Sequence, residues 1–203
     1  MSNGGWQAVT FYTAGTGYER EVERLRASAA ALEIPLEEFV YPPLGSWRMN
    51  LNYKSLCIAE AMDEFPDRDI VFIDADAAIR KYPFLFDGLS ALREYDIAFH
   101  RLVRSHLDPG RELLSGTLWV ANTERGRELI AAWHRKAIQK PAIRHQKALD
   151  EALNSKTAGW RCFTLPLAYT AIFDHPSVRG GRIDPVIEHF QASRRLRKAV
   201  RHA

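Results

Sequence analysis

Apolar positions along the chain alternate between short strand-like runs and longer stretches with helical spacing. The clearest strand is Asp69–Ile73, a nearly continuous apolar run that is typical of a strand buried on both faces. The clearest helix covers residues 18–32, where Val22, Leu25 and Ala29 recur every three or four positions. The same pattern predicts further strands at residues 7–12, 39–41, 97–100, 114–120, 161–164 and 186–190. It predicts further helices at residues 51–65, 86–95, 124–139 and 143–153.

This order of elements predicts an α/β fold. The first half of the chain alternates strand, helix, strand, helix, strand, which favours a mostly parallel central sheet flanked by helices. In such sheets ligands bind at the carboxyl ends of the strands, so the residues that follow each strand are the candidates for function. The 203 residues contain no internal repeat and no Gly/Ser linker, which indicates one domain.

The composition is that of a folded protein that needs no cysteine cross-links. Apolar residues make up 46% of the chain, which is too many for a disordered protein. Cys57 and Cys162 lie far apart and form no CxxC pair, which excludes a disulfide framework and a cysteine zinc site. The sequence has no run of about 18 apolar residues and no signal-peptide pattern, so we expect no membrane span and a cytoplasmic protein.

Charge is nearly balanced except at the C-terminal end. The chain has 28 Lys plus Arg and 25 Asp plus Glu, and its net charge of +3 is too small to indicate nucleic-acid binding. Residues 194–203 contain no acid and five basic residues, namely Arg194, Arg195, Arg197, Lys198 and Arg201. We therefore expect a domain over residues 1–193 and a basic tail over residues 194–203.

Two carboxylates follow the buried strand directly, as Asp74-Ala75-Asp76. The backbone turns at the end of a strand, so both side chains can face one point. Two hard oxygen ligands there suit a divalent cation that itself holds phosphate oxygens. The alternative is an exposed turn, where Asp is common.

This pair resembles the DxD motif of the GT-A glycosyltransferases, the nucleotide-diphospho-sugar transferases. The likeness extends over residues 6–195 as scattered short motifs, and is nearest to the small bacterial and phage-type members. It extends more loosely to the glycogenin and lipopolysaccharide galactosyltransferase group. The resemblance implies a single Rossmann-like GT-A domain, with Asp74 and Asp76 holding a metal on the diphosphate of the donor.

A third metal ligand is implied near the C-terminus. Residues 185–190 read as a strand that carries a histidine, and His189 matches the late histidine ligand of the galactosyltransferase group. An imidazole beside two carboxylates favours Mn²⁺ over Mg²⁺, which rarely takes nitrogen, although Mg²⁺ stays open. The alternative is a buried histidine bonded to the backbone.

The resemblance also implies donor-binding positions. Tyr12 and Thr13 end the first strand, where relatives bind the base and ribose of the nucleotide. Lys54 matches a basic residue that relatives place toward the nucleotide-sugar, as a phosphate or ribose contact. Ser115 and Gly116 match a small-residue turn beside the donor sugar, where glycine permits close backbone approach. For each of these five positions an ordinary packing or surface role is the alternative.

No catalytic residue stands out. Relatives often carry Asp-Gln at the start of a late helix, and here His145 replaces the Asp while Gln146 keeps its place. Gln146 and Asp150, one helical turn apart, are the catalytic candidates. Arg194 and Arg195 follow His189 closely and are candidates for contacts with the diphosphate.

These matches together predict a hexosyltransferase-like, metal-dependent enzyme. It would pass a sugar from a nucleotide-sugar, with UDP expected, to an acceptor hydroxyl on a glycan or on a hydroxylated base in DNA. A non-catalytic nucleic-acid-binding module acting through its basic tail is the alternative from another class. A haloacid-dehalogenase-type phosphatase fits less well, because it needs the DxD pair on an early strand. A nucleotidyltransferase fits less well because no Gly-rich phosphate loop follows the first predicted strand.

Overall fold

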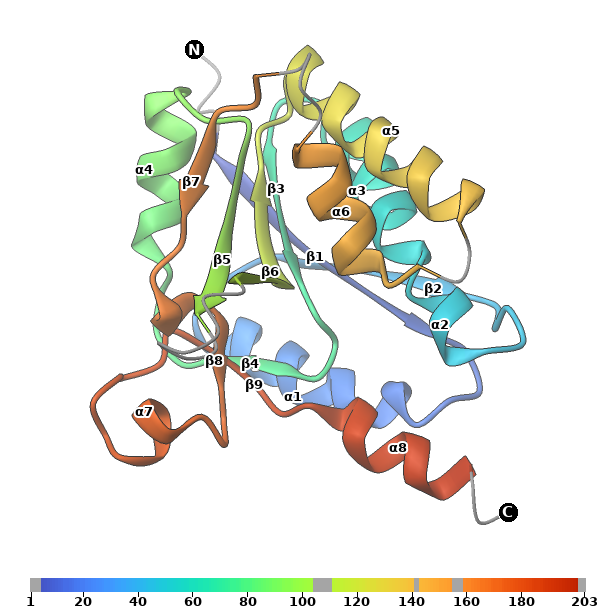
Figure 1. Cartoon of the computed structure of the whole chain (residues 1–203). Helices are drawn as coiled ribbons and strands as arrows, with labels where there is room; N and C mark the ends of the chain where they lie inside the picture. The colour runs from blue at the N-terminus through green and yellow to red at the C-terminus, as the bar shows by residue number, and fades with distance from the viewer. Residues whose placement is uncertain (1–4, 104–110, 141–142, 155–158, 201–203) are drawn as a thin grey trace.

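The computed structural model describes residues 5–103, 111–140, 143–154 and 159–200. Its strands are β1 (Trp6–Thr13), β2 (Leu36–Tyr41), β3 (Asp69–Ile73), β4 (Ala77–Ile79), β5 (Ile97–Val103), β6 (Arg111–Val120), β7 (Cys162–Thr164), β8 (Ala171–Ile172) and β9 (Ile187–His189). Its helices are α1 (Tyr18–Ala31), α2 (Trp47–Asn50), α3 (Tyr53–Glu64), α4 (Phe84–Leu92), α5 (Glu124–Gln139), α6 (His145–Leu153), α7 (Pro176–Arg179) and α8 (Ala192–Val200), with a 3₁₀ turn η1 (Leu167–Thr170). Figure 1 shows how these elements are arranged around the central sheet.

The central sheet has six strands in the order β2-β1-β3-β6-β5-β7. Strand β1 is parallel to β2 and β3, and β5 is parallel to β7. Strand β6 is antiparallel to both of its neighbours, β3 and β5, so it runs against the direction of the other strands. The α/β class and the mostly parallel sheet that the sequence predicted are confirmed.

Both faces of the sheet are covered, as the apolar run in β3 requires. Ile70 and Phe72 face a core formed with α3, α5 and α6, whereas Val71 and Ile73 face a core formed with α1 and α4. Figure 1 shows α3, α5 and α6 grouped together on one side. Because successive side chains of a strand point to opposite faces, the unbroken apolar run feeds both cores at once.

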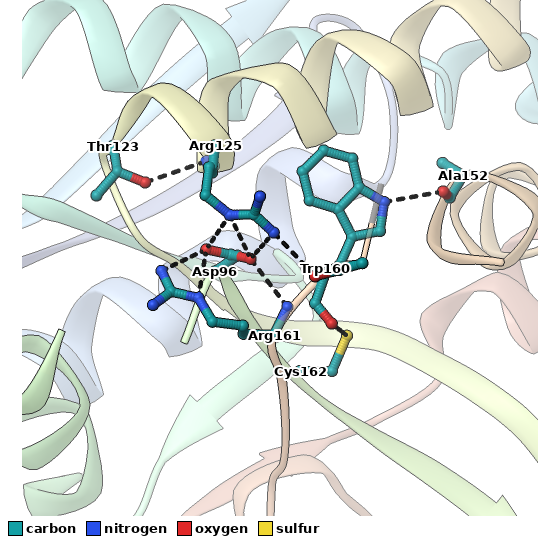
Figure 2. Close-up of polar contacts among 9 residues, drawn as sticks. Asp96, Thr123, Arg125, Ala152, Trp160, Arg161 and Cys162 are labelled. Carbon is teal, nitrogen blue, oxygen red and sulfur yellow. Dashed lines mark hydrogen bonds and ion pairs between the residues drawn. The ribbon is translucent and has the colours of Figure 1, made fainter. Parts of the chain in front are cut away.

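A buried carboxylate ties the strands to the helices at the start of β5 (Figure 2). Asp96 is fully buried and accepts hydrogen bonds from Arg125, at the start of α5, and from Arg161, just before β7. Arg161 also donates its backbone N–H to the same carboxylate at 2.9 Å. Trp160 lies under the Arg125 guanidinium and donates to the Ala152 carbonyl of α6.

The structure differs from the sequence-based expectation in its short elements. The predicted helix at residues 51–65 corresponds to α3, and the short helix α2 that precedes it was not predicted. Of the small sheet β4-β9-β8, only β9 lies within a predicted strand, and β4, β8 and the helix α7 were not predicted because such short elements carry little pattern. Helix α8 spans the predicted boundary at residue 193, and residues 201–203 of the basic tail lie outside the described part. Within the described residues, no helix is long and apolar enough to cross a membrane.

The Asp96 contacts predict a pH-dependent contribution to stability. Burial acts to raise the pKa of Asp96, but the hydrogen bonds from Arg125 and Arg161 outweigh it and lower the pKa below 3.8. Asp96→Asn should lower the free energy of unfolding by about 2–3 kcal/mol at pH 7, in urea denaturation. Because the folded-state pKa is depressed, this difference should shrink as the pH falls through the folded-state pKa.

The matched control is Asp63→Asn, which removes an ion pair between two exposed side chains. It should change stability by less than about 1 kcal/mol. If Asp96→Asn lowers the free energy of unfolding no more than the control does, the buried carboxylate does not hold these elements together.

Candidate functional site

Backbone pairing brings three potential metal ligands together. Asp74 and Asp76 lie in the turn between β3 and β4, and β4 pairs antiparallel with β9 so that Ala77 faces His189. One ligand atom from each of Asp74, Asp76 and His189 lies within 4.8 Å of the others. Asp76 and His189 are buried, and Asp74 is partly exposed. We call these three residues the Asp-Asp-His cluster.

Gly116 of β6 leaves the space in which the cluster sits. Its carbonyl accepts the Asp74 backbone N–H at 2.8 Å, which places the strand directly against the turn. A Cβ at this position would lie 2.9 Å from Cε1 of His189 and 3.3 Å from Oδ2 of Asp74. Real Cβ atoms essentially never come as close as 2.9 Å to another atom, so a side chain here would displace the imidazole of His189.

Each member of the cluster is held by the protein through one polar atom. Lys54 donates to Oδ1 of Asp74 at 2.6 Å, and the backbone N–H of Ala192 donates to Oδ2 of Asp76 at 2.6 Å. The Thr117 hydroxyl is 2.9 Å from Nε2 of His189. Outer contacts of this kind fix the direction in which metal ligands point. Oδ2 of Asp74 lies on the side of Gly116 and His189.

Burial shifts the pKa values of the cluster in opposite directions. Burial, helped by the charge of Asp74, raises the pKa of Asp76 to about 6. Burial lowers the pKa of His189 to about 4, so its imidazole is neutral at ordinary pH. Above pH 6 the cluster therefore offers two carboxylates and a neutral imidazole, which together suit Mn²⁺ or a similar cation.

A cavity of about 380 Å³ opens in front of the cluster. It is lined from β1 and its loop by Phe11, Tyr12, Thr13 and Tyr18, from α2 and α3 by Trp47, Asn50, Leu51 and Lys54, and from the DxD turn by Asp74, Ala75 and Asp76. The remaining lining residues are Leu102, Glu112, Leu114, Ser115, His145, Gln146, Ile172, Gln191, Ser193 and Arg194. This position, beyond the carboxyl ends of β1 and β3, is where open α/β sheets bind ligands.

Most of the predicted binding residues border this cavity. Tyr12, Thr13, Lys54, Ser115, Gln146 and Arg194 line it, and Gly116 lies behind the cluster. Asp150 and Arg195 are not among the lining residues. Asp150 pairs with Arg101 of β5 at 2.7 Å, and Arg195 pairs with Glu21 of α1 at 2.9 Å.

His145 occupies a constrained position in the cavity wall. Its Nε2 is 2.9 Å from the Ser115 hydroxyl, which Lys54 also approaches at 3.4 Å. Burial, together with the positive charge of Lys54, lowers the pKa of His145 well below its ordinary value. His145 therefore contributes a neutral polar group where relatives of the resembled family often carry a carboxylate.

Sequence reasoning missed part of the cavity wall. Trp47 and Tyr18 form an aromatic side in which the indole N–H donates to the tyrosine hydroxyl at 3.1 Å. Thr117 was missed as well, because its contact with His189 depends on a pairing between distant strands. Gln191 and Ser193 come to the cavity only because α8 begins there. The single sequence clue to them was their closeness to His189.

Comparison with known proteins supports the fold. No protein-family model matches the chain, and no curated protein matches its sequence. A solved glycosyltransferase involved in the glycosylation of the major capsid of PBCV-1 superposes with a TM-score of 0.66 at 14% identity, over 97% of this chain and 100% of that one. Mouse xyloside xylosyltransferase 1, in its apo form, superposes with a TM-score of 0.54 at 11% identity, over 93% and 98% of the two chains.

The chain has a glycosyltransferase fold. The likeness covers 100% and 98% of the two solved chains. The resemblance that the DxD motif suggested is thereby confirmed at the level of the fold. Within this glycosyltransferase fold, the Asp-Asp-His cluster and the adjoining cavity are the candidate site.

The first prediction from the site concerns Gly116. Gly116→Ala should weaken Mn²⁺ binding by at least about tenfold in calorimetry, because the added Cβ would push His189 and Asp74 apart. Gly88→Ala in α4 is the control, since a Cβ there meets nothing within 4 Å. Equal Mn²⁺ affinities for the two variants would mean that the space at Gly116 does not matter for cation binding.

The second prediction concerns Asp76 in the metal-free protein. Its raised pKa means that the protonated form is favoured by folding, so stability is present at low pH and lost as the pH rises through about 6. As the pH rises from 4 to 7, the free energy of unfolding of Asp76→Asn in urea should increase by about 3 kcal/mol relative to that of the wild type. A pH-independent difference between the two proteins would contradict the raised pKa.

Proposed function

We propose that the chain is a metal-dependent glycosyltransferase that transfers a sugar from a nucleotide-diphosphate donor, with UDP expected, to an acceptor hydroxyl. The observation that carries this proposal is the Asp-Asp-His cluster at one side of a 380 Å³ cavity, at the carboxyl ends of β1 and β3. The glycosyltransferase fold of the chain supports it.

The residues of the cluster fit a divalent cation. Their ligand atoms are close enough to share one ion, the neutral imidazole adds the nitrogen that favours Mn²⁺ over Mg²⁺, and Gly116 leaves the room. A cation bound there would neutralise the charge that builds on the leaving diphosphate as the glycosidic bond breaks.

The remaining wall of the cavity supports binding of the donor. Tyr12 and Trp47 offer aromatic surface for the base, and Thr13 lies at the end of β1 beside them. Arg194 also lines the cavity, where it pairs with Asp174 and offers a charged donor for phosphate oxygens. The volume of the cavity lies within the range of about 300–1,000 Å³ that is usual for small-molecule sites.

Two side chains are proposed for the sugar itself. Gln146 reaches the cavity from the first turn of α6 and can bond the sugar hydroxyls through both ends of its amide. Ser115 also lines the cavity, and its hydroxyl is held by His145. Asp150 remains a catalytic candidate only if its pair with Arg101 opens, because that pair holds it away from the lining.

No observation favours the basic tail as a nucleic-acid site over this proposal. Arg194 pairs with Asp174 and Arg195 pairs with Glu21, so the two described arginine side chains at the start of the tail have acidic partners. A glycan or a hydroxylated base in DNA both stay open as the acceptor.

The test is loss of metal-dependent nucleotide binding. Asp74→Asn and Asp76→Asn should each weaken Mn²⁺-dependent UDP binding by at least about 100-fold in calorimetry, because each removes one charged ligand. Asp184→Asn, which alters an exposed carboxylate paired with Lys81 on the surface, is the matched control and should bind as the wild type does. A panel of nucleotide-sugars tested for hydrolysis then identifies the donor.

Unchanged Mn²⁺-dependent affinity in both cluster variants, with the folds intact by circular dichroism, would show that the metal assignment is wrong. If the wild type binds no nucleotide-sugar with or without Mn²⁺, the glycosyltransferase assignment fails as well.

A further inference from the structure

Lys54 is a charged side chain sealed inside the protein beside the candidate metal site. Its side chain is 1% exposed, and it projects from the first turn of α3. Its ammonium donates to Oδ1 of Asp74 at 2.6 Å, to the carbonyl of Ser115 at 2.9 Å and to the Ser115 hydroxyl at 3.4 Å. The ring of Phe72 lies 4.8 Å away. An ammonium has three N–H donors, so all of its donors are engaged.

This arrangement makes Asp74 serve two purposes. It is the carboxylate that pairs with the buried ammonium, and it is also a member of the Asp-Asp-His cluster. Oδ1 faces Lys54, while Oδ2 faces the side on which His189 and Gly116 lie. A cation bound at Oδ2 would therefore share one carboxylate with an ammonium and be repelled by it. Repulsion of this kind is strong in a partly buried site.

The ammonium of Lys54 changes the charge balance of the site when a cation binds. With both carboxylates ionised and His189 neutral, the cluster and Lys54 together carry a net charge of −1. A divalent cation alone turns this into an excess positive charge of +1. The diphosphate of a nucleotide-sugar brings two negative charges and restores a net negative site. Without the ammonium, the cation alone would already neutralise the two carboxylates.

We propose that Lys54 is an internal counter-cation that keeps the affinity of the site for a bare divalent cation low and so couples cation binding to binding of the diphosphate. This inference rests on the metal site of the proposed function. It gives Lys54 a role that does not need direct contact with a phosphate. The cation and the diphosphate then bind as one unit, and each raises the affinity of the other by the same factor.

The opposite expectation follows if Lys54 only positions Asp74. In that case, removal of the ammonium would leave the carboxylate poorly oriented and would weaken cation binding. The two roles therefore predict changes of opposite sign in the same measurement, which makes the experiment decisive.

The experiment compares wild type with Lys54→Met and Lys54→Gln, two neutral replacements of similar length, one apolar and one polar. Mn²⁺ affinity is measured by calorimetry, first without nucleotide and then at saturating UDP. Both variants should bind Mn²⁺ alone at least about tenfold more tightly than the wild type does. The factor by which UDP raises Mn²⁺ affinity should fall by a similar amount. Lys81→Met, which removes an exposed lysine paired with Asp184, is the control and should change neither value.

Each outcome has a distinct meaning. Suppose that the wild type binds Mn²⁺ in the presence of UDP, but the folded variants bind Mn²⁺ alone no more tightly than the wild type does. That result would overturn the role of Lys54 and leave the proposed function standing. If the wild type binds Mn²⁺ no better with UDP than without it, the coupling does not exist. If neither the wild type nor the variants bind Mn²⁺ under any condition, the metal site itself is wrong and both proposals fall. Thermal unfolding of each variant shows whether it is folded.

Discussion

The pairing of β4 with β9 is the constraint on which the candidate site depends. Asp76 and His189 are more than a hundred positions apart in the sequence, and only the register that sets Ala77 opposite His189 brings them together. The contact is reinforced at the next position, where the Phe190 N–H donates to the Asp76 carbonyl at 2.9 Å. Strand β4 in turn packs on α1, so the small sheet is anchored to the larger one. A one-residue slip would turn His189 away from the cluster.

Two buried carboxylates, Asp96 and Asp76, receive very different sets of donors from the fold. Asp96 receives two arginine side chains and a backbone N–H, and these donors hold its pKa below the ordinary value despite burial. Asp76 receives one backbone N–H, and burial beside Asp74 raises its pKa to about 6. Asp96 therefore has its charge satisfied by the protein. The charge of Asp76 is left for a partner that the protein does not itself supply.

The sequence predicted those parts of this structure whose pattern is local. The apolar run of β3, the helical spacing in α1 and the Asp-x-Asp turn after a strand each follow from neighbouring residues, and they predicted the sheet and two of the three cluster residues. His189 needed a resemblance, because a lone histidine has no pattern of its own. The contacts of Thr117 and Trp47 and the acceptors around Lys54 could not be predicted, since each joins residues that are far apart in the sequence.

The last helix shows why the predicted tail was difficult to interpret from charge alone. From charge alone its basic residues indicated contacts with the diphosphate or a nucleic-acid site, but α8 begins by donating the Ala192 N–H to Asp76. Leu196 then packs on Gly17, where a Cβ would come within 2.5 Å of the leucine side chain. A helix fixed at both of these points presents its positive N-terminal end toward the cluster. The part of the tail nearest His189 therefore belongs to the architecture of the site, and its sequence position after β9 matters more than its net charge.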